Sequence, residues 1–161
     1  MAVLMDERIL IRPYVPGDVD ATIEIFLRSI REVSSKDYSA AEIAAWAKVE
    51  DRALWAERRM SRPAWMAEIA GNAVGFSDLT SDGCLDMMFV HPGYQGIGVA
   101  TRLLGRVEEE ALRLGFRRIY TEASRTARPF FERKGFRVIT RQTVEKRGQG
   151  LENFLMEKFY A

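Results

Sequence analysis

The stretch VHPGYQGIGVAT, residues 90–101, decides the fold of this chain. An apolar run precedes it, and the apolar positions after it recur every three and four residues, which predicts a loop between a strand and a helix. Gly93, Gly96 and Gly98 lack a Cβ, so they permit the positive φ angles of a tight loop and let a ligand approach the main chain. The first amides of the helix have no partner within it and lie at the positive end of its dipole. The stretch therefore predicts a binding site for a phosphate group.

The sequence beyond the loop predicts the long helix and four further elements. They are a helix over 98–114, a strand over 118–123, a short helix over 127–134, and strands over 136–145 and 151–159. Gly115 and Gly135 are the expected stop signals of the two helices. A four-residue turn over 147–150 is expected between the last two strands.

The sequence before the loop predicts three strands in a row. Residues 63–70 and 73–80 are apolar, β-compatible runs, and we expect Gly71-Asn72 to join them as a tight hairpin. Residues 84–90 are rich in Met, Phe and Leu and are expected to form a buried central strand that ends at the loop.

The first third of the chain is predicted to be mostly helical after a short strand over 9–14. Asp18 is placed to accept hydrogen bonds from the first amides of one helix. Ser39 and Glu42 have the spacing of a capping box at the start of a second helix. Asp51 can start a third, short helix.

Length and charge limit the classes of protein to which the chain can belong. Its 161 residues predict one domain over residues 1–161, since a domain has about 100 to 200 residues. It is 47% hydrophobic, which excludes intrinsic disorder. Because 24 Lys and Arg balance 23 Asp and Glu, no global field attracts nucleic acid or a membrane surface. No apolar run approaches the roughly 20 residues of a membrane-spanning helix.

Cys84 and His91 are the single cysteine and histidine of the chain. One of each leaves no internal disulfide and no cluster for a metal, which predicts a reducing, cytoplasmic setting without a metal site. We expect Cys84 to be a small buried hydrophobe and His91 to be a turn residue. Residues 1–8 lack the basic and then apolar pattern of a secretion signal.

Three families of phosphate-binding loop combine glycines with a helix N-terminus in this way, and they differ in the spacing of their motif residues. A Walker A loop could use Gly93 and Gly98, but Val99 then stands where its lysine must reach the outer phosphates. A dinucleotide fingerprint could use Gly96 and Gly98, but it then meets Thr101 in place of its last small residue and finds no carboxylate about 20 residues further on. Both patterns are therefore incomplete in this chain.

The third pattern, Q/R-x-x-G-x-G/A, is complete as Gln95-x-x-Gly98-x-Ala100. In this position the chain resembles the acetyl-coenzyme A loop of the GNAT superfamily of N-acetyltransferases. A second block is similar to the family's A-x-x-F-Y-E-x-x-G-F segment, through Ala127, Phe130, Phe131, Glu132, Gly135 and Phe136. The resemblance implies a mixed α/β fold: a twisted mixed sheet of about seven strands flanked by helices, in the order β-α-α-βββ-α-β-α-ββ.

The resemblance also implies how acetyl-coenzyme A is held. Main-chain groups of Phe89 and Val90 are expected to bond the pantetheine arm, in the manner of an added β-strand. Arg125 and Arg128 are candidates for contacts with the adenosine phosphates, and the resemblance also places Phe131 among the cofactor-binding residues. The pyrophosphate is expected to bind the amides of one run and the hydroxyl at its end: Gln95, Gly96, Ile97, Gly98, Val99, Ala100 and Thr101.

Two carboxylates are candidates for the base that deprotonates an amine acceptor, whose free pKa is near 10 in lysine. Glu122 lies in the strand after the long helix and matches a position where some family members keep a glutamate. Asp86 is expected in the middle of a buried strand, where an acid is costly unless it is used or paired. The structural alternative for each is a carboxylate that pairs with an arginine or a hydroxyl across the sheet.

Phe131 stands where the family usually has a tyrosine that protonates the departing thiolate. A phenyl ring cannot donate a proton, but a thiolate with a pKa of about 8.5 can leave without strong acid help. Tyr38, Tyr120 or an ordered water are the possible substitutes. Tyr38 also belongs, with Trp46 and Trp55, to the helical segment that closes over the acceptor in similar folds, so these residues are candidates for the wall of the acceptor pocket.

The sequence therefore predicts a cytoplasmic acyltransferase that moves the acetyl group of acetyl-coenzyme A to a primary amine of a small molecule or peptide. We expect a monomer or homodimer that binds neither nucleic acid nor membranes. The alternative is a non-catalytic acyl-coenzyme A sensor, motivated by Phe131.

Overall fold

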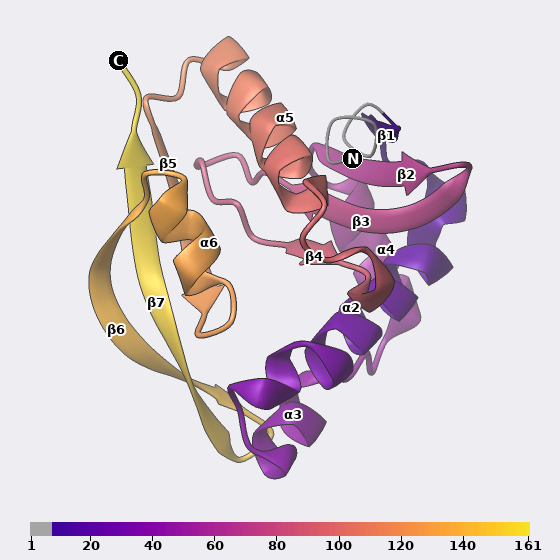
Figure 1. Cartoon of the computed structure of the whole chain (residues 1–161), viewed down its shortest axis with the longest axis vertical. Helices are drawn as coiled ribbons and strands as arrows, with labels where there is room; N and C mark the ends of the chain where they lie inside the picture. The colour runs from indigo at the N-terminus through magenta and orange to yellow at the C-terminus, as the bar shows by residue number, and fades with distance from the viewer. Residues whose placement is uncertain (1–7) are drawn as a thin grey trace.

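The computed structural model describes residues 8–161, and residues 1–7, on which the expectation about a secretion signal rests, lie outside the described part. The described chain contains seven strands in two sheets and five α-helices (Figure 1). The strands are β1 (Ile9–Pro13), β2 (Ala64–Ile69), β3 (Asn72–Asp78), β4 (Met88–Val90), β5 (Arg118–Ser124), β6 (Arg137–Lys146) and β7 (Gln149–Phe159). The helices are α2 (Val19–Glu32), α3 (Ala40–Trp46), α4 (Arg52–Met60), α5 (Val99–Arg113) and α6 (Arg128–Arg133).

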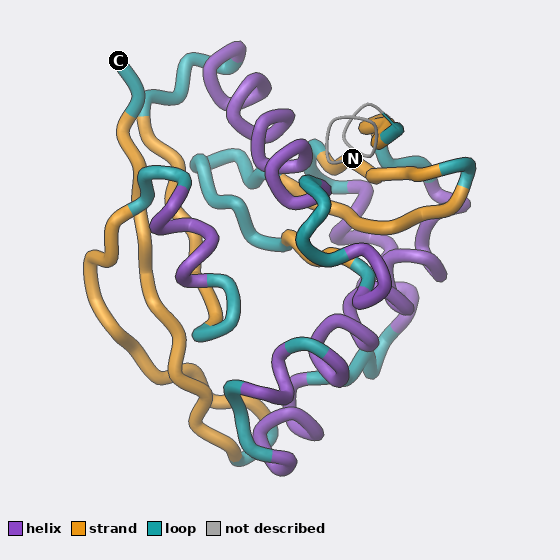
Figure 2. Tube along the Cα trace, viewed as in Figure 1, coloured by secondary structure: helices purple, strands orange, loops and turns teal. Residues whose placement is uncertain are grey.

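The two sheets are both antiparallel, with strand orders β1-β2-β3-β4 and β5-β7-β6. A single parallel bridge between Cys84 and Tyr120 joins them at the start of β5. Figure 2 shows the strands in two groups on opposite sides of the molecule, with α5 between them. The mixed α/β class with about seven strands is thus confirmed, but the parallel part of the expected mixed sheet is reduced to this bridge.

Local capping explains the helical first third. Ser39 accepts the amide of Glu42 at 3.1 Å while the Glu42 carboxylate accepts the amide of Ser39 at 2.8 Å, so the expected capping box is formed. Asp51 caps α4 by accepting the amide of Leu54 at 3.0 Å, so the expected third, short helix is present in addition to the two helices of the order that the resemblance implies. Asp18 makes no cap bond to α2. Instead its carboxylate binds the guanidinium of Arg12 at 2.7 and 2.8 Å and accepts the amide of Val15 at 2.9 Å, so both of its oxygens are engaged away from α2.

The β2–β3 hairpin turns one residue earlier than the sequence predicts. Ala70 and Gly71 occupy the turn with φ of 51° and 80°, and Asn72 already begins β3. The pairing register is set by side chains buried on the core face, such as Ile69 and Val74, and not by the turn propensity of Asn72.

The expected strand over 84–90 is much shorter, since only Met88–Val90 forms β4. The residues before it bond to two different partners in turn, so they do not form a continuous ladder. The last hairpin shows the opposite difference. Its turn contains only Arg147 and Gly148, with φ of 46° and 83°, so β6 ends one residue later and β7 begins two residues earlier than expected.

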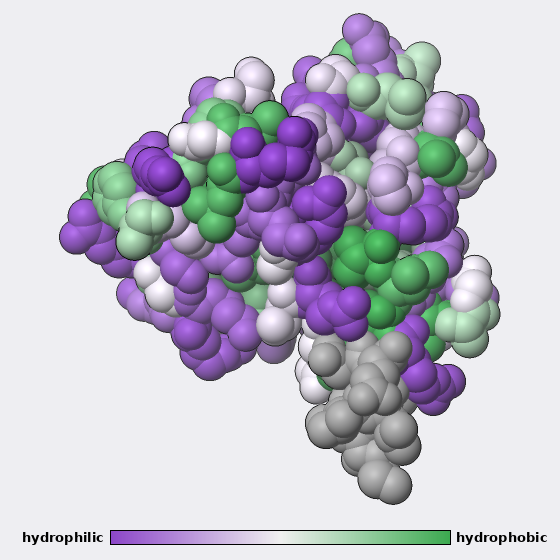
Figure 3. All heavy atoms as spheres, turned by 90° about the horizontal axis from the view of Figure 1, so that it is seen from above, coloured by the Kyte–Doolittle hydropathy of each residue, from purple (hydrophilic) through white to green (hydrophobic). Residues whose placement is uncertain are grey.

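The core places α5 between the two sheets. Its inward residues Leu103, Leu104 and Val107 are all buried, and they pack against both strand groups. The other helices α2, α3 and α4 cover the opposite face of the first sheet through a second core cluster that includes Phe26 and Trp55. Seen from above, hydrophilic residues cover most of the surface, and apolar residues appear in separate patches (Figure 3).

Candidate functional site

The loop before α5 has the geometry that its glycines predicted. Gly96 and Gly98 adopt φ of 74° and 102°, in the left-handed region that favours glycine. Gly98 is the N-cap of α5, and the helical bonding begins with the amide of Arg102 on the carbonyl of Gly98 at 3.0 Å. The amides of residues 99–101 therefore have no acceptor within the helix, and they lie at its positive end.

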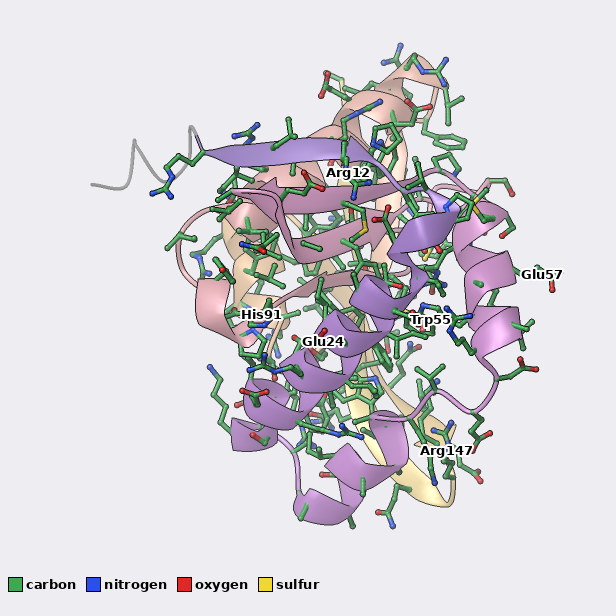
Figure 4. All side chains as sticks on the ribbon, turned by 90° about the vertical axis from the view of Figure 1, so that its right-hand side faces the viewer. Arg12, Glu24, Trp55, Glu57, His91 and Arg147 are labelled. Atoms are coloured by element: carbon green, nitrogen blue, oxygen red, sulfur yellow. The ribbon has the colours of Figure 1, made fainter. Side chains whose placement is uncertain are left out.

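Side chains of the loop hold it against β4. The Gln95 side-chain amide donates to the carbonyl of Val90 at 2.8 Å. His91 Nδ1 lies 3.0 Å from the amide of Gly93, within a short 3-10 turn, Pro92–Tyr94, that His91 caps. Figure 4 shows His91 beside α2, where its ring contacts Arg28. This placement agrees with a turn residue, as expected for His91.

The two sheets separate just before the loop. The amide of Leu85 donates to the carbonyl of Tyr120 at 2.9 Å, and the Thr121 hydroxyl donates to the carbonyl of Leu85 at 2.7 Å, so residue 85 still lies against β5. The next two amides, those of Asp86 and Met87, donate to one carboxylate oxygen of Asp78 on β3, at 3.1 and 2.7 Å. From here β4 pairs with β3 alone and β5 with β7 alone, which leaves their facing edges unpaired.

A cavity of about 590 Å³, which we call the loop cavity, lies along this separation. It is bounded by β4, the α5 N-terminus, β5 and α6, and nine of the predicted binding residues line it: Phe89, Val90, Gln95, Gly96, Gly98, Val99, Ala100, Thr101 and Phe131. Three further predicted residues, Ile97, Arg125 and Arg128, do not line it. Arg128 is instead paired with Glu132 at 3.3 Å and stacked 4.5 Å from the ring centroid of Phe154.

A second cavity of about 430 Å³, the outer cavity, opens between α2, α4 and the tip of the last hairpin. Aromatic rings form its inner wall: Phe26, Tyr38, Trp46, Trp55 and Phe89. Neighbouring rings contact one another, as Phe26 and Trp55 do at 4.9 Å between centroids. Figure 4 shows Trp55 between α2 and α4. Three of the five rings are those of Tyr38, Trp46 and Trp55, the candidates for an acceptor wall.

The two cavities meet at a few shared residues: Trp46, Asp86, Phe89, Glu122 and Ser124. Both candidate bases are therefore at the junction, although they come from different segments of the chain. Ser124 was not singled out by the sequence, since a serine at a strand end carries no signal of its own. The junction is where a group from one cavity can reach a group from the other.

Glu122 and Asp86 differ in their surroundings. Glu122 is exposed on β5, and within residues 8–161 its carboxylate forms no hydrogen bond or ion pair. Asp86 is 47% exposed at its side chain and pairs with Arg62 at 2.9 Å, so the prediction that it lies in the middle of a buried strand is wrong. The physical reason is the Asp78 carboxylate, which turns residues 86 and 87 toward β3 and lets the Asp86 side chain face solvent.

Asp78 is the buried acid that the sequence analysis missed. It is 0% exposed, and burial raises its pKa to about 6, partly offset by the amide of Met87 and the nearby charge of Arg59. Its second oxygen has no hydrogen bond and lies 3.6 Å from Arg62 and 4.0 Å from Arg59. The rule applied to Asp86, that an acid in an apolar strand is costly unless it is used, also applies to Asp78 within its apolar run.

The proposed substitutes for the missing tyrosine are engaged elsewhere. Phe131 is 3% exposed and packs edge-on against Phe136. The Tyr38 hydroxyl donates to the carbonyl of Glu152 at 2.6 Å and accepts the amide of Arg125 at 2.9 Å. Tyr120 donates to Asp82 and lines neither cavity.

Two other residues that the sequence singled out have surroundings that indicate a structural role. Arg125 donates to the Glu152 carboxylate at 3.0 Å and to the carbonyl of Asp37 at 2.9 Å, so its guanidinium ties β7 to the segment after α2. Cys84 is half-buried rather than fully buried, and burial raises the pKa of its thiol to about 12, which disfavours a nucleophilic thiolate.

No cluster of metal-ligating side chains was found among residues 8–161, and no helix in this range is long and apolar enough to span a membrane.

Comparison with known proteins identifies the family of this fold and site. The family model of the acetyltransferase (GNAT) domain matches residues 34–158. An uncharacterized N-acetyltransferase of Escherichia coli, YafP, is 38% identical over 148 residues, which cover 92% of this chain and 94% of the relative. The chain belongs to the GNAT family, and it is an acetyltransferase by class.

Solved structures agree with this assignment. A GCN5-related N-acetyltransferase from Rhodopseudomonas palustris, described as an "Aminotransferase, Class-II", superposes with a TM-score of 0.91 at 35% identity, covering 93% of this chain and 94% of that one. The YncA acetyltransferase of Salmonella typhimurium, solved with acetyl-CoA, has a TM-score of 0.72 at 20% identity, with 95% and 94% coverage, and shows the shared fold. The family resemblance inferred from the loop is thereby confirmed, whereas the roles of the individual site residues stay predictions.

Proposed function

We propose that the protein transfers the acetyl group of acetyl-CoA directly to a primary amine of a small molecule or peptide. The observation that carries the proposal is the junction of two cavities at Glu122 and Asp86. One cavity is lined by a helix N-terminus suited to a diphosphate, and the other is open to an acceptor. A solved relative of this fold contains acetyl-CoA, which supports the same co-substrate here.

The residues of the loop cavity fit this co-substrate. The unbonded amides of residues 99–101, with Gly96 and Gly98 before them, are suited to phosphate oxygens because no Cβ blocks the main chain there. The unpaired edge of β4 at Phe89 and Val90 can bond amide groups of an extended chain. When bound, acetyl-CoA supplies an activated acyl group as a thioester.

The residues at the junction handle the acceptor and its protons. Glu122 is the better candidate for the base, since it lines both cavities and its carboxylate has no partner among residues 8–161, whereas Asp86 is paired with Arg62. The protonated acceptor first gives up one proton to the base, directly or through water, and this proton passes to solvent. The nitrogen then bonds to the acetyl carbon as the carbon–sulfur bond breaks; it loses a second proton, and the departing thiolate takes one up to become the thiol. Positioning of the two reactants contributes much of the rate, because the two cavities hold them at one place.

The test combines binding with turnover. Calorimetry with acetyl-CoA and CoA should show saturable binding, and a thiol-release assay should show product only when an amine acceptor from a broad panel is added. Binding without acceptor-dependent thiol release would favour a sensor. Absence of heat with millimolar CoA on folded protein would overturn both readings.

A further inference from the structure

The charged side chains that line the outer cavity are not equally engaged. Five are acidic, namely Glu50, Asp51, Asp86, Glu122 and Glu152, and five are basic, namely Lys48, Arg58, Arg59, Lys146 and Arg147. The formal sum is zero, so the field that an acceptor meets depends on which of these charges already have partners.

Four of the five carboxylates are already engaged. Glu50 binds Arg147 at 2.7 Å, and Asp51 caps the amide of Leu54. The third, Asp86, binds Arg62. Glu152 accepts from Arg125 and Arg141, at 3.0 and 3.4 Å. Only the fifth, at the inner end of the cavity where it meets the loop cavity, has no partner within the described residues.

Three of the five basic side chains are not held by a hydrogen bond or an ion pair among the described residues. Within the described part of the chain, Lys48, Arg58 and Lys146 form no side-chain hydrogen bond or ion pair, and all three are exposed. They come from three separate segments around the mouth of the cavity: the connection between α3 and α4, the helix α4, and the end of β6. Figure 4 shows Arg147, next to Lys146, at the tip of the last hairpin below α4. With Arg147, four cations at this end of the cavity face two carboxylates, those of Glu50 and Asp51, so cations are in excess there.

The two ends of the outer cavity differ in a way that defines an acceptor. The inner end has the free carboxylate of Glu122, the middle is walled by aromatic rings such as Trp46 and Phe89, and the outer end has free cations. An amine directed to the inner end leaves the rest of its molecule against the rings and the cations. Charge complementarity of this kind selects a partner and raises its rate of encounter.

We propose that the acceptor is an amine whose apolar, preferably aromatic, body carries an anionic group such as a carboxylate. This inference rests on the proposed acetyl transfer and adds the class of the acceptor. The amine lies at the junction with the loop cavity, the body packs on the aromatic wall, and the anionic group faces Lys48, Arg58 and Lys146.

The experiment uses pairs of amines that differ only in the acid group. Benzylamine is compared with 4-(aminomethyl)benzoate, and phenethylamine with 4-(2-aminoethyl)benzoate, each in the thiol-release assay with saturating acetyl-CoA. In both acidic members the carboxylate lies at the far end of the ring from the amine. We expect a higher kcat/KM for the acidic member in at least one pair, the one in which the distance between amine and acid matches the length of the outer cavity. This difference should become smaller as salt is added, because exposed charges are screened.

Variants locate the selectivity on the chain. The variant K48Q/R58Q/K146Q should raise KM for the acidic member about tenfold, from three exposed charge contacts, and should leave KM for the neutral member within about twofold. Arg117→Gln is the matched control, since it also removes an exposed positive charge but lies outside the lining of both cavities. It should change neither value.

The outcomes separate this inference from the proposed function. Equal kcat/KM for both members of every pair, or equal losses for acidic and neutral amines in the triple variant, would overturn the inference while acetyl transfer itself stands. Binding of acetyl-CoA with no thiol release from any amine would instead overturn the proposed function. Circular dichroism of each variant shows that a loss of activity does not come from unfolding.

Discussion

The carboxylate of Asp78 accepts the amide of Met87 at 2.7 Å, and its same oxygen accepts the amide of the preceding residue at 3.1 Å. Neither amide is then available to β5, which lies on the other side. This contact therefore directs the chain from one sheet to the other and holds open the separation that becomes the loop cavity. A buried acid on β3 in this way shapes a binding site that it does not line.

The burial of Asp78 predicts an unusual dependence of stability on pH. An unfolded Asp ionises near its ordinary pKa of about 3.9, whereas burial raises the folded pKa to about 6. Between these values the folded protein binds more protons, so its unfolding free energy falls as the pH rises through the window, by up to roughly 3 kcal/mol. Asp78→Asn, which keeps an acceptor oxygen, should lack this fall. Urea denaturation at pH 4.5 and pH 7 gives the unfolding free energy of the parent and of the variant. An equal change with pH in both proteins would contradict the raised pKa of Asp78.

Gly98→Asp should remove binding at the loop. A side chain at φ of 102° is strained, and a carboxylate beside the first amides of α5 repels a diphosphate, so affinity for CoA should fall about 100-fold. Gly105→Asp is the matched control, because it adds the same charge within α5, where a Cβ meets nothing within 4 Å. Calorimetry measures both. If Gly98→Asp binds CoA as the parent does, the diphosphate does not lie at this helix N-terminus.

Glu122→Gln tests the base. We expect kcat to fall about 100-fold and the pH optimum to move upward, since turnover then depends on the fraction of acceptor that is already deprotonated. Affinity for acetyl-CoA should be nearly unchanged. Glu109→Gln, an exposed acid on α5 that lines neither cavity, is the control. An unaltered pH profile would remove Glu122 from this role.

Tyr38→Phe separates structure from proton donation. The hydroxyl joins the carbonyl of Glu152 to the amide of Arg125, so its loss should lower the unfolding free energy by about 1–3 kcal/mol. Because this hydroxyl is already engaged, kcat at saturating substrates should change less than about twofold. A large loss of kcat with intact stability would instead identify Tyr38 as the acid. Tyr94→Phe serves as the stability control.

Sequence patterns located the elements well where local chemistry determines them. The capping box of Ser39 and Glu42, the cap at Asp51 and the glycine-rich entry to α5 all depend on contacts a few residues apart, and each is present in the structure. The site loop belongs to this group, which is why its residues could be named from spacing alone.

The differences arise where partners are distant in the sequence. The shortened β4 depends on Asp78 and Thr121, which compete for the same segment from two sheets, and neither is visible in the composition of residues 84–90. The capping role expected of Asp18 was lost to Arg12, whose position depends on strand pairing. The sequence correctly indicates that a buried acid lies in this region, but only the fold shows that it is Asp78 and not Asp86.

The single bridge between Cys84 and Tyr120 has a consequence for the lifetime of the protein. Because the edges of β4 and β5 are unpaired beyond it, a molecule that fills the separation supplies the missing main-chain partners to both halves. By mass action, such a ligand at about 100 times its dissociation constant adds about 2.7 kcal/mol against unfolding. Resistance to proteolysis should therefore rise and fall with the supply of that molecule in the surroundings of the chain.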